Sequence, residues 1–243
     1  LSAFEPDWLE SIERMRGMQV IDSEHWLNEQ LDAGKRVLAE GAQGALLDIG
    51  LGSYPFVTSS TTTSAGACTG LGIAPTRIGE VIGIFKAYCT RVGSGPFPSE
   101  LHDEVGDKLR EAGNEFGATT GRPRRCGWLD MPALHYAAMI NGVTTLCMMK
   151  ADVLGDFDTV PVCTHYEIDG EHVDKLPYVV DEGALKPHTQ DMPGWPGDQT
   201  GVRTEEELPK TLVEYMAYIE AKIGAPIGIV SLGPNRLQTI IRK

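Results

Sequence analysis

The segment Gly113–Asp130, GNEFGATTGRPRRCGWLD, holds the densest group of residues able to bind an anion. Two glycines flank small and hydroxylated residues, and arginines follow: Gly117, Ala118, Thr119, Thr120, Gly121, Arg122, Arg124 and Arg125. Paired glycines indicate a loop that can bend. Hydroxyl and backbone N–H groups donate hydrogen bonds, and guanidinium groups bind carboxylates or phosphates through two parallel bonds. The pattern predicts a lid, residues 117–125, over an anionic ligand; the alternative is a solvated turn with surface charges.

A second candidate site follows the apolar run Thr144–Met149, which is typical of a buried strand. Lys150, Ala151 and Asp152 come directly after it, and ligands of open α/β sheets bind at this end of a strand. A carboxylate there can accept both guanine N1–H and N2–H while the lysine stem packs on the base. Adenine lacks this donor pair and would leave polar groups unpaired. Lys-x-Asp alone is more commonly an exposed ion pair.

A third candidate is the stretch 41–63, which is rich in Gly, Ser and Thr and has six consecutive hydroxylated residues at 58–63. Such a composition is also found in low-complexity linkers. Apolar residues are interspersed, however: Leu46, Leu47, Ile49, Tyr54, Phe56 and Val57. They favour a folded loop that faces a ligand.

Four long motifs resemble the adenylosuccinate synthetase family, in one register from about Val37 to Arg242. They are GNEFGATTGRPRRCGWLD, EGAQGALLDIGLGSYPFVTSS (40–60), TRVGSGPFPSEL (90–101) and KADVL (150–154). The resemblance implies a C–N ligase of AMP biosynthesis. In that family GTP phosphorylates the 6-oxygen of IMP, and the amino group of L-aspartate displaces the phosphate to give adenylosuccinate.

Site residues follow from the resemblance position by position. IMP would be bound by Gln43, Thr58, the Val92 carbonyl and Arg122, the last two at the ribose. Aspartate would be bound by Ala118, Thr119, Thr120, Gly121, Arg122 and Arg124. GTP would be bound by Arg124, Lys150, Ala151, Asp152, Ser231, Leu232 and Gly233. Lid closure would keep water from the phosphorylated intermediate.

The sequence departs from the family pattern in two ways. Single residues differ where the family usually has Asp, Asn, a basic residue and Asp: Gly50, Thr61, Pro123 and Asn235. The phosphate loop G-D-E-G-K-G-K is also absent from the 243 residues. In the family that N-terminal part carries the general-base aspartate and the Mg²⁺ ligand, the acid histidine, and an arginine lent by a second subunit.

The resemblance therefore implies the C-terminal part of one large P-loop-NTPase-like domain, inactive alone, with its catalytic and metal-binding residues elsewhere. The full-length enzyme would be a homodimer that uses Mg²⁺ and GTP. Two alternatives stay open. One is a regulatory module that binds guanine nucleotides without chemistry, and the other is an inactive scaffold whose partner half is a separate chain.

Composition limits the partners. The formal net charge of -13 argues against nucleic acid and anionic membranes as partners. No apolar run approaches the ~20 residues of a membrane span, and the N-terminus lacks the basic start and apolar core of a signal peptide. Five dispersed cysteines form no C-x-x-C pair. We expect a cytoplasmic protein whose ligands are small molecules.

Elements that could position these sites can be read from hydrophobic periodicity and from turn signals. Helices are predicted at 6–16, 23–33, 131–141 (capped by Asp130) and 208–224. Strands are predicted at 36–40, 144–149, 160–168, 171–176, 226–231 and 239–242. Residues 78–92 are predicted as a helix passing into a strand near 87–91, and 186–203 as an irregular connection. Strands alternating with helices predict an α/β fold, with a mainly parallel sheet and flanking helices.

Overall fold

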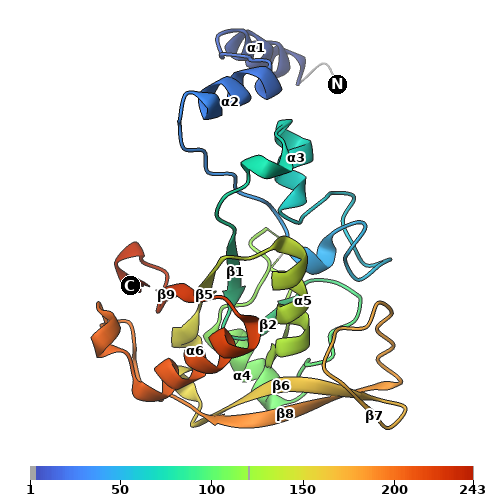
Figure 1. Cartoon of the computed structure of the whole chain (residues 1–243), viewed down its shortest axis with the longest axis vertical. Coiled ribbons are helices and arrows are strands. Elements are labelled where there is room, and N and C mark those ends of the chain that lie inside the picture. The colour runs from blue at the N-terminus through green and yellow to red at the C-terminus, as the bar shows by residue number, and fades with distance from the viewer. Residues whose placement is uncertain (1–3, 120, 243) are drawn as a thin grey trace.

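A computed structural model describes residues 4–119 and 121–242, and it has the predicted α/β architecture (Figure 1). Its central sheet has the order β1-β5-β9-β10. The strands are β1 (Ile82–Lys86), β5 (Thr145–Met149), β9 (Ile227–Ser231) and β10 (Thr239–Ile241). β1, β5 and β9 are parallel, whereas β10 is antiparallel to β9. The predicted strands at 144–149, 226–231 and 239–242 are therefore confirmed.

Three helices pack around this sheet. α5 (Met131–Asn141) begins after Asp130, whose Oδ1 accepts a hydrogen bond from Ala133 N at 3.0 Å, and ends at Gly142 with φ +62°. Both ends agree with the prediction. α6 (Lys210–Ile223) buries Leu212, Tyr215, Met216 and Ile219 at helical spacing, also as predicted. α4 (Glu104–Ala112) was not predicted; the Asp103 carboxylate caps it by accepting from two backbone N–H groups.

A second sheet and a strand pair complete the body. The sheet contains β4 (Leu129–Asp130), β6 (Thr159–Ile168), β7 (Glu171–Val173) and β8 (Leu185–Pro193). The β6–β7 hairpin turns at Asp169 and Gly170, as predicted. β8 corrects the prediction that 186–203 is irregular throughout, because it pairs with β6 along its length. β2 (Cys89–Arg91) and β3 (Arg125–Gly127) form the separate pair.

Two further predictions were wrong. Residues 36–40 form no strand, and all of them are exposed; an isolated β-prone run without a neighbouring strand gains no ladder hydrogen bonds. Residues 78–92 contain β1 and β2 instead of a helix leading into a strand. β1 occupies the position expected for the helix because it pairs with β5 over its whole length. Sheet pairing outweighs local propensity here.

The N-terminal helices lie at one end of the long axis, apart from the sheets (Figure 1). α1 (Glu5–Arg16) buries none of its residues, α2 (Ser23–Asp32) buries Leu27, and α3 (Ala65–Leu71) lies close to α2. Short 3₁₀ turns are η1 (Ala45–Leu47), η2 (Pro75–Arg77), η3 (Ala151–Asp156), η4 (Glu205–Glu207) and η5 (Arg236–Gln238). No helix within residues 4–119 and 121–242 is long and apolar enough to cross a membrane.

Candidate functional site

The candidate site is built on the C-terminal ends of the parallel strands. Lys86 ends β1, Lys150 follows β5, and Ser231 ends β9. In the sheet register Lys86 lies beside Met149, and Met148 lies beside Val230. All three strand ends therefore meet at one edge, where open α/β sheets bind ligands.

One fully buried carboxylate, Glu115, accepts hydrogen bonds from several side chains at this edge of the sheet. Its Oε1 accepts hydrogen bonds from Lys86 Nζ at 2.8 Å, Lys150 Nζ at 2.8 Å and Tyr88 OH at 2.6 Å. Its Oε2 accepts from Arg124 Nη1 at 2.6 Å. The side chain of Glu115 is 0% exposed. Burying a charged carboxylate costs free energy unless it is paired and hydrogen-bonded in this way.

The electrostatics of this cluster favour an ionised Glu115 and an added anion. Burial alone would raise the pKa of Glu115, but hydrogen bonds from Lys150, Lys86 and Tyr88 outweigh it and hold the pKa at about 2. Burial lowers the pKa of Lys86, and Glu115 opposes that shift. Three cations thus surround one carboxylate, in a chain whose formal net charge is -13. The local excess of positive charge suits a carboxylate or phosphate ligand.

The predicted lid is a hairpin-like loop above this cluster. Gly117 N donates to Arg122 O at 2.8 Å, and Arg124 N donates to Glu115 O at 2.9 Å. Gly121 has φ +63°, a left-handed conformation that suits glycine. Ala118, Thr119 and Arg122 are exposed, whereas Thr120 lies outside the described residues.

Arg124 is held on one side only. Its Nη1 donates to Glu115, but its buried Nε has no hydrogen-bond partner within residues 4–119 and 121–242. A buried unpaired donor costs free energy, on the order of 1–3 kcal/mol. Nε is thus a buried donor that still lacks an acceptor among the described residues.

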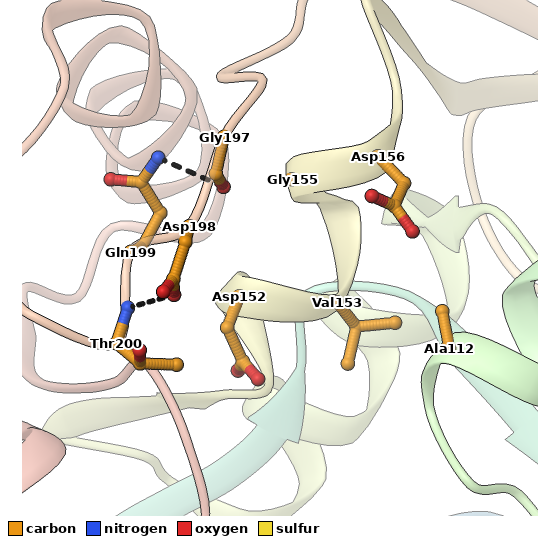
Figure 2. Close-up of a pocket in the computed structure, with 9 residues that line it drawn as sticks. All are labelled: Ala112, Asp152, Val153, Gly155, Asp156, Gly197, Asp198, Gln199 and Thr200. Carbon is orange, nitrogen blue, oxygen red and sulfur yellow. Dashed lines mark hydrogen bonds between the residues drawn. The ribbon is translucent and has the colours of Figure 1, made fainter.

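Asp152 lines a cavity of about 350 Å³ between η3 and the 197–200 loop. The lining residues are Ala112, Asp152, Val153, Gly155, Asp156, Gly197, Asp198, Gln199 and Thr200. Figure 2 shows the two segments facing each other across this space. Asp152 Oδ1 is buried and accepts no hydrogen bond from the part of the chain that the structure describes. Burial raises the pKa of Asp152, and the nearby Asp198 raises it further.

The cavity walls are joined by close backbone contacts. Trp195 is 1% exposed, and its indole Nε1 donates to Ala151 O at 2.8 Å. Gly197 N donates to Gly155 O at 2.9 Å. A Cβ at Gly155 would lie 2.5 Å from Gly197 O, so only glycine allows the two segments to approach this closely.

The predicted segment Ser231–Gly233 connects to the same cavity. Ser231 Oγ donates to Gly233 O at 3.0 Å, and Leu232 N donates to Gln238 O at 2.8 Å. The Gln238 amide in turn donates to Thr200 O at 3.3 Å, on the cavity wall. The bond between Gln238 and Thr200 therefore brings the turn after β9 to the wall of the cavity that Asp152 lines.

Three of the four residues that the resemblance assigns to IMP, namely Gln43, Thr58 and Val92, lie on loops outside the lid. Asp48 is buried and organises the hydroxyl-rich loop by accepting four backbone N–H bonds, from Gly50, Leu51, Thr62 and Thr63. Thr58 N donates to Leu47 O at 2.9 Å within it. The stretch is thus a folded loop and not a linker.

This loop is joined to the turn after β2. The Arg91 guanidinium donates to Phe56 O at 3.1 Å and to Ser94 O at 3.1 Å, and so connects the Thr58 loop with the Val92 turn. Val92 is 69% exposed. Gln43 is also exposed. The IMP assignments therefore remain predictions.

Candidate metal ligands do not cluster in the part of the chain that the structure describes. Within residues 4–119 and 121–242, no group of three or more His, Cys, Asp or Glu side chains could hold a metal ion. The resemblance places the metal ligand and the catalytic acid and base outside this chain.

Sequence reasoning missed Glu115, the residue that joins the lid to the strand ends. It belongs to the lid motif, but no local pattern pairs it with its donors. Lys86, Tyr88 and Lys150 lie 29, 27 and 35 residues away from it. Its place in the motif was the one signal available.

Comparisons with known proteins agree with this geometry. The sequence profile of the family described as adenylosuccinate synthetase matches residues 5–240. The adenylosuccinate synthetase of Cytophaga hutchinsonii is 59% identical over 232 residues, which cover 95% of this chain and 54% of that protein. The enzyme of Parabacteroides distasonis is 55% identical over 242 residues, covering 100% and 57%. The chain spans about half the length of the curated relatives it matches.

Solved structures show the same likeness. The fully ligated adenylosuccinate synthetase of Plasmodium falciparum superposes with a TM-score of 0.89 at 40% identity, over 92% of this chain and 54% of that one. Succinoaminodeoxyadenylate synthetase of cyanophage S-2L superposes with a TM-score of 0.58 at 21% identity, over 92% of this chain and 51% of that one. The second match concerns the fold alone.

Proposed function

Because the chain belongs to the adenylosuccinate synthetase family, we propose that it is the guanine- and aspartate-binding part of an enzyme that ligates L-aspartate to IMP with GTP. The product would be adenylosuccinate, with GDP and phosphate released. The chain would be a portion of one domain, and the full-length enzyme a homodimer, as the resemblance implies. The five cysteines are unpaired, which supports a cytoplasmic setting.

One observation carries this proposal: Asp152 lines a cavity, and its buried Oδ1 has no partner among the described residues. Guanine offers two adjacent donors, N1–H and N2–H, that a carboxylate can accept in one plane. Lys150 and Ser231–Gly233 lie at the same sheet edge, so the base would be bound between segments that the structure already joins.

Aspartate would bind at the lid. Arg124 Nε is a buried donor without a partner among the described residues, and a substrate carboxylate would supply the acceptor. Arg122, Thr119 and the rest of the loop would close over it and exclude water. The contribution of this chain is thus binding and positioning, whereas proton transfer and phosphate activation would come from the remainder of the enzyme.

Guanine recognition can be tested with the 243-residue chain itself. We expect calorimetric titration to give a Kd for GDP about a hundredfold below that for ADP, because adenine leaves Asp152 unpaired. Equal affinities for GDP and ADP would contradict the proposed guanine site. Mixing the chain with IMP, GTP and aspartate should give no adenylosuccinate; turnover by the chain alone would show that it contains the catalytic groups.

The lid assignment is tested in a complete synthetase that contains these 243 residues. Arg122→Ala should impair the use of aspartate about ten- to a hundredfold, because one charged contact is lost. If KM for aspartate and kcat both stay near those of the wild type, the lid does not bind aspartate. Binding of guanine nucleotides without binding of IMP would favour a regulatory module instead.

A further inference from the structure

We propose that Glu115 is a shared positioning residue, which holds Arg124 for aspartate and Lys150 for the guanine nucleotide at the same time. The inference rests on the proposed function and deepens it. No motif or resemblance assigns a role to Glu115. Its two carboxylate oxygens are divided between the two ligand-binding segments: Oε2 accepts from Arg124 on the lid, and Oε1 accepts from Lys150 at the strand end.

Lys150 needs such an anchor because its backbone is unfavourable. Its φ is +59°, a left-handed conformation that non-glycine residues rarely adopt. Its ammonium group donates to Glu115 Oε1 at 2.8 Å and to Gly113 O at 2.6 Å. Both acceptors lie at the base of the lid, so the lid segment fixes the residue that directly precedes Ala151 and Asp152.

Arg124 is oriented by the same carboxylate. The bond from Nη1 to Glu115 and the bond from Arg124 N to Glu115 O fix both ends of this residue. With Nη1 held, the planar guanidinium group has a defined direction for Nε. Loss of the carboxylate would leave Nε free to turn away from its ligand.

The cluster pairs Lys86, Lys150 and Arg124 with the same carboxylate, Glu115. The three cationic side chains are 26%, 34% and 29% exposed, so each also faces the surface. The cluster therefore carries more positive than negative charge where the lid segment meets the end of β5.

The test is steady-state kinetics in a complete synthetase that contains these 243 residues, with each substrate varied in turn. Glu115→Gln keeps the shape of the side chain but removes its charge. We expect KM for GTP and KM for aspartate to rise in parallel, each about tenfold, while KM for IMP changes by less than about twofold. A solely structural role would lower the melting temperature and leave all three KM values unchanged.

Tyr88→Phe provides a milder second variant. Its hydroxyl donates to Glu115, and its ring is 1% exposed, so Phe fills the same volume. We expect both KM values to rise about two- to fivefold, again in parallel. If Glu115→Gln does not fold, this variant decides the question, and unchanged KM values would overturn the inference.

Glu100→Gln is the matched control, because Glu100 pairs with the neighbouring arginine, Arg125, and is also largely buried. It should leave KM for GTP and for aspartate unchanged. A rise in only one of these two values in Glu115→Gln would show that Glu115 is not shared. An inactive wild-type enzyme would instead contradict the proposed function, so the two failures are distinguishable.

Discussion

Two carboxylates at the same sheet edge have opposite environments. Glu115 is fully buried and accepts hydrogen bonds from four side chains, which hold its pKa at about 2. Asp152 is half-buried, one of its oxygens has no partner among the described residues, and burial raises its pKa. The first carboxylate is satisfied by side chains of the protein, whereas one oxygen of the second is buried without a partner among the described residues. The difference is what we expect if Glu115 positions the site and Asp152 binds.

The largest expected effect is on the free energy of unfolding, measured after Glu115 or Asp152 is replaced by alanine. Glu115→Ala leaves three cations without their shared acceptor and should lower the free energy of unfolding by about 3 kcal/mol. Asp152→Ala removes an unpaired oxygen and should change it by less than about 1 kcal/mol. Urea denaturation of the 243-residue chain measures both. Equal losses in the two variants would break the distinction.

The next effect concerns nucleotide choice. In Asp152→Asn one acceptor becomes an NH₂ donor, which opposes the N2–H donors of guanine but matches the 2-oxygen of xanthine. In a complete synthetase the ratio of kcat/KM for GTP to that for XTP should fall about ten- to a hundredfold. KM for IMP and for aspartate should change little.

Asp198→Asn is the control for this change. Asp198 lines the same cavity, but its carboxylate already accepts from Thr200 N at 2.8 Å. This variant should keep the preference for GTP. An unchanged ratio in Asp152→Asn would mean that Asp152 does not recognise the base.

A smaller effect is expected at Arg124, which is satisfied on one side and unpaired on the other. Arg124→Lys keeps the charge beside Glu115 but loses Nε. We expect KM for the anionic ligand at this position to rise about tenfold, while stability changes by less than about 1 kcal/mol. Comparing KM for aspartate with KM for GTP identifies which ligand Nε contacts. A stability loss without any KM change would show that Arg124 is structural.

The smallest expected effect is on how the free energy of unfolding depends on pH. Glu115 and a third buried carboxylate, Asp130, should contribute to it in opposite directions. Burial raises the pKa of Asp130 to about 6, although Tyr166 OH and Ala133 N donate to it. Its ionisation therefore opposes folding above that pH, and the penalty disappears as the pH falls. The stabilisation by Glu115 is present above about pH 4.5 and is lost only as the pH falls towards 2.

Between pH 7 and pH 5, protonation of Asp130 should raise the free energy of unfolding by about 1 kcal/mol. Asp130→Asn should abolish this rise, because the amide does not titrate, yet an asparagine still caps α5. Urea denaturation of both proteins at the two pH values measures the difference. The same pH dependence in both would mean that Asp130 is not responsible.

Local patterns predicted the elements whose determinants are local. α5 has its cap, Asp130, and its stop, Gly142, in adjacent sequence, and the β6–β7 hairpin is specified by Asp169 and Gly170. β8 could not be found in this way. Pro187 and Pro193 argue against a strand, but β8 pairs with β6 alone among the described strands, and edge strands accept proline.

The site shows the same limit. Lys150, Asp152 and the lid were predicted because their residue types and order identify them, and the structure places them at one sheet edge. Glu115 was missed because its role depends on side chains from β1, the turn before β2, the lid exit and the end of β5. These side chains meet only in the folded protein, so no regular spacing in the sequence could have predicted the cluster.

The N-terminal helices α1 and α2 make few contacts with the rest of the protein, so they should unfold locally before the sheets do. α1 buries nothing, and α2 is joined to the following segment by Asn28 Nδ2 donating to Gly72 O at 2.9 Å and by an exposed Arg77–Asp32 pair. Amide protons of α1 should therefore exchange with solvent through local opening, whereas those of β5 wait for global unfolding. The connection 33–44 is exposed throughout. A protease that cuts there would separate α1 and α2 from the part of the chain that holds the sheets and the lid.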